Sequence, residues 1–279
     1  MFFGFGGQRI GSDVVNRTRL LFALLWLAIA HLVLFGRPWP ISGLDAPRTG
    51  WLAASAVLGL VIGDGALFQS YVLVGPRLGT LMMSFVPIAS AAMAWVFLGQ
   101  TIGGWQALGI ALTVGSVVWV VTDRAAPAPD VTRQRFRIGI FLGLVGALGQ
   151  SANLITARMA LGADLPTISA SYVRIVVAAF VLWSLSAARG QTRHAVARWS
   201  DRRALAAVAA GSFVGPFLGI WLSLVAIQNT EVGVAATLMA LPPVLLIPIG
   251  YFLLGERVTR RAVAGTTMAF AGVACVILG

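Results

Sequence analysis

The sequence predicts an all-α integral membrane protein made of two inverted repeats of about five transmembrane helices. Of its 279 residues, 58% are hydrophobic and 10% are charged, whereas a water-soluble domain has about 25% charged residues. The apolar residues form continuous runs of about 20 residues, which is typical of spanning helices and not of alternating barrel strands. The second half of the chain also repeats the pattern of the first, as in duplicated transporter units.

Nine apolar runs are long enough to cross a bilayer as helices. In chain order they are Leu20–Gly36, Trp51–Gly75, Leu78–Leu98, Gly103–Thr122, Ile138–Ala160, Pro166–Ala188, Ala204–Ile227, Val232–Leu254 and Ala262–Gly279. The longest polar connections are Asp123–Arg137 and Arg189–Arg203, so no room is left for a soluble domain. We therefore expect a multi-pass protein whose main partner is the lipid bilayer.

The basic residues indicate how the chain is oriented in the membrane. All of them are arginine, and the formal net charge is +11. They lie in short gaps between apolar runs and form no single stripe, which argues against nucleic-acid binding. When the three arginines in or at the start of helices are set aside, fourteen fall on one side and three (Arg37, Arg48 and Arg158) on the other. The positive-inside rule then predicts that the chain lies in the cell membrane with its N-terminus in the cytoplasm.

Two stretches 156 residues apart read alike. Pro87–Gly109 and Pro243–Gly265 each contain a proline, eleven mostly apolar residues, a glycine, nine further residues and a glycine. Upstream, Arg19 in "NRTRLL" corresponds to Arg174 in "SYVRIV". The second copy contains five predicted helices, and because five is odd, the two copies must be inverted with respect to each other.

The repeat also divides the chain into parts. Residues 1–122 form the first repeat, 123–137 a cytoplasmic linker and 138–279 the second repeat. Met1–Gln8 aligns with the tail of a helix whose counterpart is Ile138–Ala157. Either the protein lacks most of its first helix, or the sequence begins inside the gene.

Together these residues resemble the drug/metabolite transporter superfamily, EamA type. The resemblance rests on the doubled five-helix unit, the proline–"LG"–glycine run that ends each unit, and the arginine early in the second helix of each. It covers nearly the whole chain, although Gln100 stands where the family motif usually has Glu. It implies movement of small metabolites or drugs across the cytoplasmic membrane by efflux or exchange, in many members coupled to protons.

Asp64 is the first candidate site residue, because it is the only charged side chain in the apolar run 51–75. A charged Asp at the bilayer centre costs about 2.5–3.5 kcal/mol. Phe68 and Tyr71 follow at helical spacing and share its face. Two roles remain open for Asp64: proton coupling or substrate binding in a polar cavity, and a structural hydrogen bond to a neighbouring helix.

The remaining candidates are polar residues and prolines inside predicted helices. Gln150 and Asn153 share a face in mid-span, where a substrate contact and an interhelical hydrogen bond are both consistent with the pattern. Arg19 and Arg174 fit an anion or gate-pairing site, or snorkelling to the headgroups. Candidate hinges for alternating access are the prolines in the helices that carry the "LG" motifs, Pro87, Pro242 and Pro243.

No catalytic, metal-binding or cofactor motif is found. His31, His194 and Cys275 are isolated in the sequence, and none of the common nucleophile, zinc or phosphate-loop patterns occurs. A membrane-embedded enzyme would need two acid/base groups at one depth, but only Asp64 lies deep. We therefore expect a transporter of small molecules with no cofactor; the alternative is a non-transporting scaffold or sensor, suggested by the short first repeat.

Overall fold

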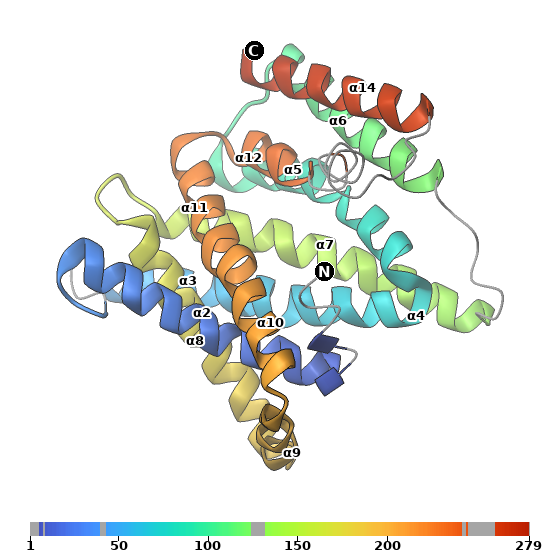
Figure 1. Cartoon of the computed structure of the whole chain (residues 1–279). Helices are drawn as coiled ribbons and strands as arrows, with labels where there is room; N and C mark the ends of the chain where they lie inside the picture. The colour runs from blue at the N-terminus through green and yellow to red at the C-terminus, as the bar shows by residue number, and fades with distance from the viewer. Residues whose placement is uncertain are drawn as a thin grey trace. The chain divides into compact units, whose positions relative to one another are not determined.

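The computed structural model describes residues 6–7, 9–39, 43–123, 132–241, 244 and 260–278. Within these ranges the chain is helical and contains no strand. It divides into two compact units, each made from both halves of the sequence. Unit 1 comprises Met1–Val57 and Thr156–Gln228, and unit 2 comprises Leu58–Ile155 and Asn229–Gly279. Figure 1 shows the helices of both units.

Unit 1 is built around two long antiparallel helices, α2 (Ser12–Phe35) and α8 (Thr167–Ala188). Near the start of α2, Arg17 donates to Ser186 Oγ near the end of α8 at 2.7 Å. Near the end of α2, His31 Nε2 lies 3.0 Å from Ser169 Oγ at the start of α8. These two contacts at opposite ends fix the antiparallel direction.

The other helices of unit 1 pack on this pair. Helix α3 (Ala46–Ala56) packs on α8, and α10 (Arg202–Ser212) packs on α2. Helix α10 continues as the π-helix η3 (Phe213–Gly219) and then as α11 (Ile220–Asn229). Two short elements, α9 (Thr192–Ala197) and η2 (Arg198–Ser200), connect α8 to α10.

Unit 2 begins inside the π-helix η1 (Val57–Gly63) and contains α4 (Asp64–Met83), α5 (Val86–Leu98), α6 (Gly104–Asp123), most of α7 (Arg133–Ala160), α12 (Val232–Met239) and α14 (Arg260–Leu278). Helices α6 and α14 pack closely. A Cβ on Gly109, near the start of α6, would lie 2.5 Å from the carbonyl oxygen of Gly272, far along α14. Because only glycine permits this approach, the small residues position the two backbones.

The repeat predicted from the sequence extends to individual helix boundaries. Several boundaries in the second copy lie 156 residues after their counterparts: α3 corresponds to α10, η1 to η3, and the start of α6 to the start of α14. The caps repeat as well. The carboxylate of Asp45 accepts from Arg48 N at 2.7 Å, and that of Asp201 accepts from Ala204 N at 3.0 Å, so an aspartate caps α3 and α10 alike.

The repeat-related helices of unit 1 run in opposite directions. Helix α3 begins beside Asp164, just before α8, through the Arg48–Asp164 ion pair. Helix α10 begins beside Arg9, just before α2, through the Arg9–Asp201 ion pair. Because α2 and α8 are antiparallel, α3 and α10 start at opposite ends of the unit, as inverted repeats require.

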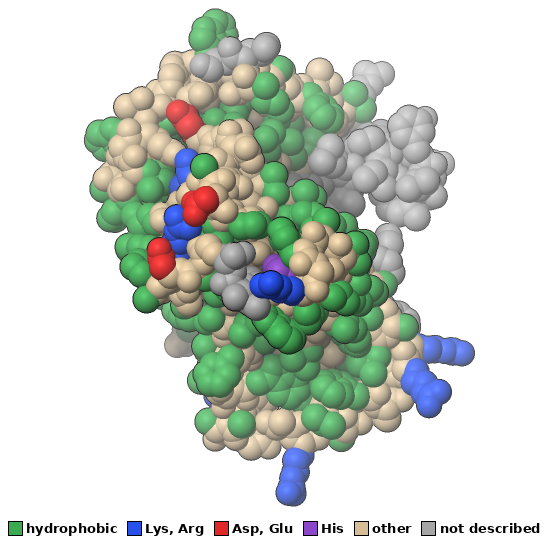
Figure 2. Space-filling view, turned by 90° about the vertical axis from the view of Figure 1, so that its left-hand side faces the viewer, with side chains coloured by type: hydrophobic (Ala, Val, Ile, Leu, Met, Phe, Trp, Pro, Cys, Tyr) green, Lys and Arg blue, Asp and Glu red, His purple; other side chains and the backbone are tan. Residues whose placement is uncertain are grey.

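Six helices in the described ranges are long and apolar enough to cross a membrane, and two shorter apolar ones span Gly104–Trp119 and Val263–Ile277. Several side chains facing outward are hydrophobic, including Val33, Val72 and Phe180, which are 77%, 72% and 71% exposed. Hydrophobic side chains also cover much of the face in Figure 2. A multi-pass membrane protein follows from these features. The count of nine spans stays a prediction, since most of Val232–Leu254 beyond α12 lies outside the described residues.

The helix ends differ from the predicted runs in ways that polarity explains. Helix α2 begins at Ser12 and not at Leu20, and α7 begins at Arg133 and not at Ile138. Apolar runs mark only the part of a helix that lies in hydrocarbon, whereas polar residues extend it into the interface. The predicted span Leu78–Leu98 is divided by a turn at Ser84 and Phe85 between α4 and α5.

Candidate functional site

Asp64 is the first residue of α4 and follows directly on the π-helix η1. A π-helix accommodates one extra residue per turn, widens the helix locally and is frequent at functional sites. Glycines at Gly59 and Gly63 allow another helix to approach this segment. The sequence predicted a carboxylate inside an apolar span here, but hydrophobicity does not distinguish a π-helix from an α-helix.

Three of the predicted site residues form a connected hydrogen-bond chain in unit 2. Gln150 Nε2 donates to Asp64 Oδ1 at 2.8 Å and also faces the carbonyl oxygen of Gly59 at 3.4 Å. Asn153 Nδ2 donates to Gln150 Oε1 at 3.2 Å. With two acceptors at its nitrogen and a donor at its oxygen, the amide of Gln150 has one favoured orientation. Asp64 and Gln150 are half-buried, while Asn153 is buried at 4% exposure.

Glycines on both helices allow the two backbones to come close enough for these hydrogen bonds. A Cβ on Gly59 would lie 2.6 Å from Asn153 Cγ, and one on Gly149 would lie 2.9 Å from the carbonyl oxygen of Leu58. A Cβ on Gly63 would lie 3.4 Å from Gln150 N. Helix α7 therefore packs with its backbone against η1, and the Gln150 amide reaches Asp64 across a short gap.

Phe68 and Tyr71 follow Asp64 along α4 as predicted. Their ring centroids are 6.0 Å apart in an edge-to-face arrangement, a favourable geometry for aromatic pairs. Tyr71 is half-buried and Phe68 is 37% exposed. The two rings thus extend one side of the polar cluster with aromatic surface.

The two repeat-paired arginines belong to unit 1, whereas the polar cluster belongs to unit 2. Arg19 is half-buried in α2, and Arg174 in α8 is only 1% exposed. A snorkelling side chain ends in water or among headgroups, so snorkelling does not describe Arg174. Because Arg174 is enclosed within the protein, a role in a gate or an anion site remains the prediction for this residue.

The predicted proline hinges are only partly within the described residues. Pro87 is buried in the first turn of α5, where a missing backbone N–H breaks no helical hydrogen bond. It therefore marks the junction between α4 and α5 and does not kink a helix from inside. Pro242 and Pro243 lie outside the described residues. A further break that the sequence did not indicate occurs at Gly75, whose φ of 85° interrupts α4.

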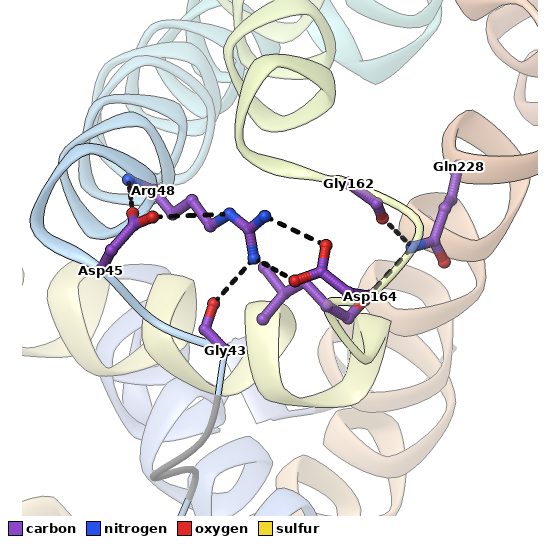
Figure 3. A network of polar contacts seen from close by, with 7 residues as sticks. Gly43, Asp45, Arg48, Gly162, Asp164 and Gln228 are labelled. Carbon is purple, nitrogen blue, oxygen red and sulfur yellow. Dashed lines mark hydrogen bonds and ion pairs between the residues drawn. The ribbon is translucent and has the colours of Figure 1, made fainter.

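An ion-pair network at one end of unit 1 was not predicted (Figure 3). Arg48 binds Asp164 through two parallel hydrogen bonds, Nη1 to Oδ2 at 2.7 Å and Nη2 to Oδ1 at 3.0 Å. Arg48 Nη1 also donates to the carbonyl oxygen of Gly43 at 3.1 Å. The hydrogen bond from Arg48 lowers the pKa of the Asp164 carboxyl group. Such bidentate pairs fix geometry as well as charge.

Gln228 holds the same loop from another helix (Figure 3). From the end of α11, its Nε2 donates to the carbonyl oxygens of Gly162 at 2.7 Å and Leu165 at 3.1 Å. The α7–α8 loop is therefore tied on two sides, to α3 through Asp164 and to α11 through its backbone. From the sequence, Arg48 was only one of the three arginines on the less basic side, and nothing paired it with Asp164.

Metal binding is not indicated: within the described ranges no group of three or more His, Cys, Asp or Glu side chains is placed to hold an ion. The site is thus one of hydrogen-bonding and ionic groups on helices. Such an arrangement can bind polar solutes or protons. Binding of this kind is the common function of carboxylates inside a membrane.

Comparison with known proteins defines the family. The model of the "EamA-like transporter family" matches residues 1–122 and 137–278, one match for each repeat. A solved structure described as "Crystal structure of protein" has the same fold with a TM-score of 0.76 and 15% sequence identity, over 99% of this chain and 92% of that chain. None of the curated proteins matches. The chain belongs to the EamA-like transporter family, whose members are membrane transporters of the drug/metabolite transporter superfamily.

Proposed function

We propose that this protein is a secondary transporter of small organic metabolites or drugs in the cell membrane, working by efflux or exchange with its N-terminus in the cytoplasm. Membership of the EamA-like family supports the general activity. The excess of arginine on one side supports the orientation. The division into repeats 1–122 and 138–279 joined by a linker is part of the proposal.

Alternating access moves the helices of one repeat against those of the other around a central site. The π-helices η1 and η3 lie at matched positions of the two repeats, and π-helical turns are frequent at functional sites. η3 also contains Pro216, which removes one backbone donor. The boundary between the two compact units falls within η1, at Val57. We propose bending at these segments, together with the junction at Pro87 and the predicted hinges Pro242 and Pro243.

The observation that carries the proposed site is the hydrogen bond from Gln150 to Asp64 at 2.8 Å. A carboxylate that accepts from a neutral amide can exchange this donor for a substrate amine or hydroxyl, or for a proton. Phe68 and Tyr71 provide an adjacent surface for an apolar or cationic portion of the substrate. Arg19 and Arg174 are proposed to set the position of helices α2 and α8 during gating.

Transport in proteoliposomes tests this proposal. Purified protein is reconstituted with an internal pH-sensitive dye, and amino acids, nucleosides and quaternary ammonium dyes are supplied outside as probes. A probe that the wild-type protein moves faster than protein-free vesicles defines the substrate class. Asp64→Asn is expected to lower that flux at least about tenfold, the effect of losing one charged hydrogen-bond partner. Asp130→Asn, in the predicted linker, is the matched control and is expected to transport like the wild type.

If Asp64→Asn transports at the wild-type rate, Asp64 is not part of the site. If no solute exchange distinguishes wild-type vesicles from vesicles containing the Asp64→Asn and Gln150→Leu double variant, the scaffold or sensor alternative replaces the transporter.

A further inference from the structure

Unit 1 contains a pocket of about 380 Å³ where α2 begins and α8 ends. Its lining residues come from two stretches, Ile10–Arg17 at the start of α2 and Gly190–Ala195 around α9. Figure 1 shows α9 directly beyond the end of α8. The volume lies in the range of about 300–1,000 Å³ that is usual for small-molecule sites.

Arg17 supplies the positive charge of this pocket. Its Nη1 donates to Ser186 Oγ at 2.7 Å, and its Nη2 donates to Gln191 Oε1 at 2.7 Å. Both partners are neutral, so neither cancels the charge of the guanidinium. Arg9 nearby in the sequence differs, since its Nε forms an ion pair with Asp201 at 2.6 Å. The two neutral acceptors hold the Arg17 guanidinium in place, and among the described side chains no carboxylate pairs with it.

The polar rim and the apolar floor of the pocket are separate. His194 and Gln191 line it with exposed side chains, and Gln191 uses its oxygen for Arg17, which leaves its amide N–H groups as donors. Ile10, Val14 and Ala195 also line the pocket and belong to the buried apolar cluster beneath it. The pocket therefore combines hydrogen-bond donors for an anion with an apolar wall. These two features match the phosphate and the glycerol carbon atoms of a phospholipid headgroup.

The position of the pocket fits an interface with charged lipid. The same end of the unit carries further arginines, namely Arg189, Arg193, Arg198, Arg202 and Arg203. Trp199 packs against the apolar cluster and donates from Nε1 to Thr18 Oγ1 at 3.1 Å. Tryptophan and arginine together are typical of the membrane–water boundary on the cytoplasmic side.

We propose that this pocket binds a phosphate group, carried by an anionic phospholipid headgroup or present as a free phosphate. Arg17 binds the phosphate oxygens, Gln191 and His194 donate to them from the rim, and the apolar wall takes the carbon atoms of a headgroup. Occupation of the pocket joins the start of α2 to the end of α8 through a bound anion.

Binding of short-chain phosphatidylglycerol to the purified full-length protein in neutral detergent tests the proposal, with phosphatidylcholine of the same chain length and inorganic phosphate as further probes. The wild-type protein is expected to prefer phosphatidylglycerol to phosphatidylcholine. Arg17→Gln should weaken phosphatidylglycerol binding about tenfold, and Arg17→Lys should weaken it less. Inorganic phosphate that competes with the lipid identifies free phosphate as a second ligand; absence of competition restricts the site to the headgroup.

Two variants separate this site from general charge effects and from misfolding. Arg193→Gln removes an exposed charge from the same helix α9 without altering the pocket lining, and it should bind the lipid like the wild type. His194→Ala changes an exposed side chain of the rim and should weaken binding while thermal stability is unchanged. Equal binding of the two lipids by the wild type, unchanged binding by both Arg17→Gln and His194→Ala, or an equal loss in Arg193→Gln would overturn the proposal.

Discussion

The amide of Gln150 donates to the carboxylate of Asp64 at 2.8 Å, joining α7 to the helix turn that follows the π-helix η1. The same amide nitrogen faces the Gly59 carbonyl oxygen, and its oxygen accepts from Asn153. One side chain thus orders a carboxylate, a π-helical carbonyl and a buried amide.

Gln150→Leu is expected to lower both stability and transport. It leaves the carboxylate of Asp64 and the amide of Asn153 each without this partner, and a buried polar group that loses its partner costs about 1–3 kcal/mol. Thermal unfolding in detergent and flux in proteoliposomes measure the two effects. Gln134→Leu is the matched control because Gln134 is exposed near the start of the same helix. Equal unfolding temperatures for the two variants would contradict a role for the Gln150 amide.

Gly59→Ala is expected to destabilise the protein by about 1–3 kcal/mol, the usual cost of overpacking. The new Cβ would lie 2.6 Å from Asn153 Cγ and 2.7 Å from its Cβ, so the backbone of η1 or α7 must move. Gly65→Ala is the control, since its Cβ would meet nothing within 4 Å and alanine favours a helix over glycine. The prediction fails if Gly59→Ala unfolds at the same temperature as Gly65→Ala.

Asp164→Asn is expected to lower thermal stability near neutral pH and to have no such effect in acid. The hydrogen bond from Arg48 lowers the pKa of Asp164, so the ion pair stabilises the folded state above the ordinary Asp pKa of about 3.9. This contribution is lost as the pH falls through the lowered pKa. The difference in unfolding temperature between wild type and Asp164→Asn should therefore be constant from about pH 8 to pH 5 and disappear in stronger acid.

The double variant Arg48→Gln/Asp164→Asn completes this test. If the two residues act through their bidentate contact, the double variant should lose less stability than the two single variants lose in sum. Strict additivity of the two single effects would show that Arg48 acts mainly through the Gly43 carbonyl or the α3 cap.

Much of the fold could be predicted from hydrophobicity and the internal repeat. The predicted runs Gly103–Thr122 and Pro166–Ala188 agree closely with α6 and α8. The spacing of 156 residues, found from Pro87 and Pro243, also relates η1 to η3 and the caps Asp45 and Asp201. These features follow from local composition and from repetition, which a single sequence contains.

The features that the sequence did not predict depend on contacts between distant residues. Arg48 and Asp164 lie 116 residues apart, and no periodicity pairs them. The sequence places Gln150 and Asn153 on one face but does not connect them to Asp64, and only the packing of α7 on η1 brings their atoms into contact. A π-helix differs from an α-helix by one residue per turn, which leaves the apolar pattern of Val57–Gly63 unchanged.

The measurement that tests the central proposal most directly compares two activities of Asp64→Asn: net accumulation of a solute and equilibrium exchange of the same solute. Vesicles are loaded with a solute that the wild-type protein transports, and its movement is followed with an imposed pH gradient and, separately, as exchange without one. If Asp64 carries the coupling proton and the cluster binds the solute, Asp64→Asn should keep measurable exchange but lose accumulation driven by the gradient. Accumulation by Asp64→Asn equal to that of the wild type would contradict proton coupling through Asp64.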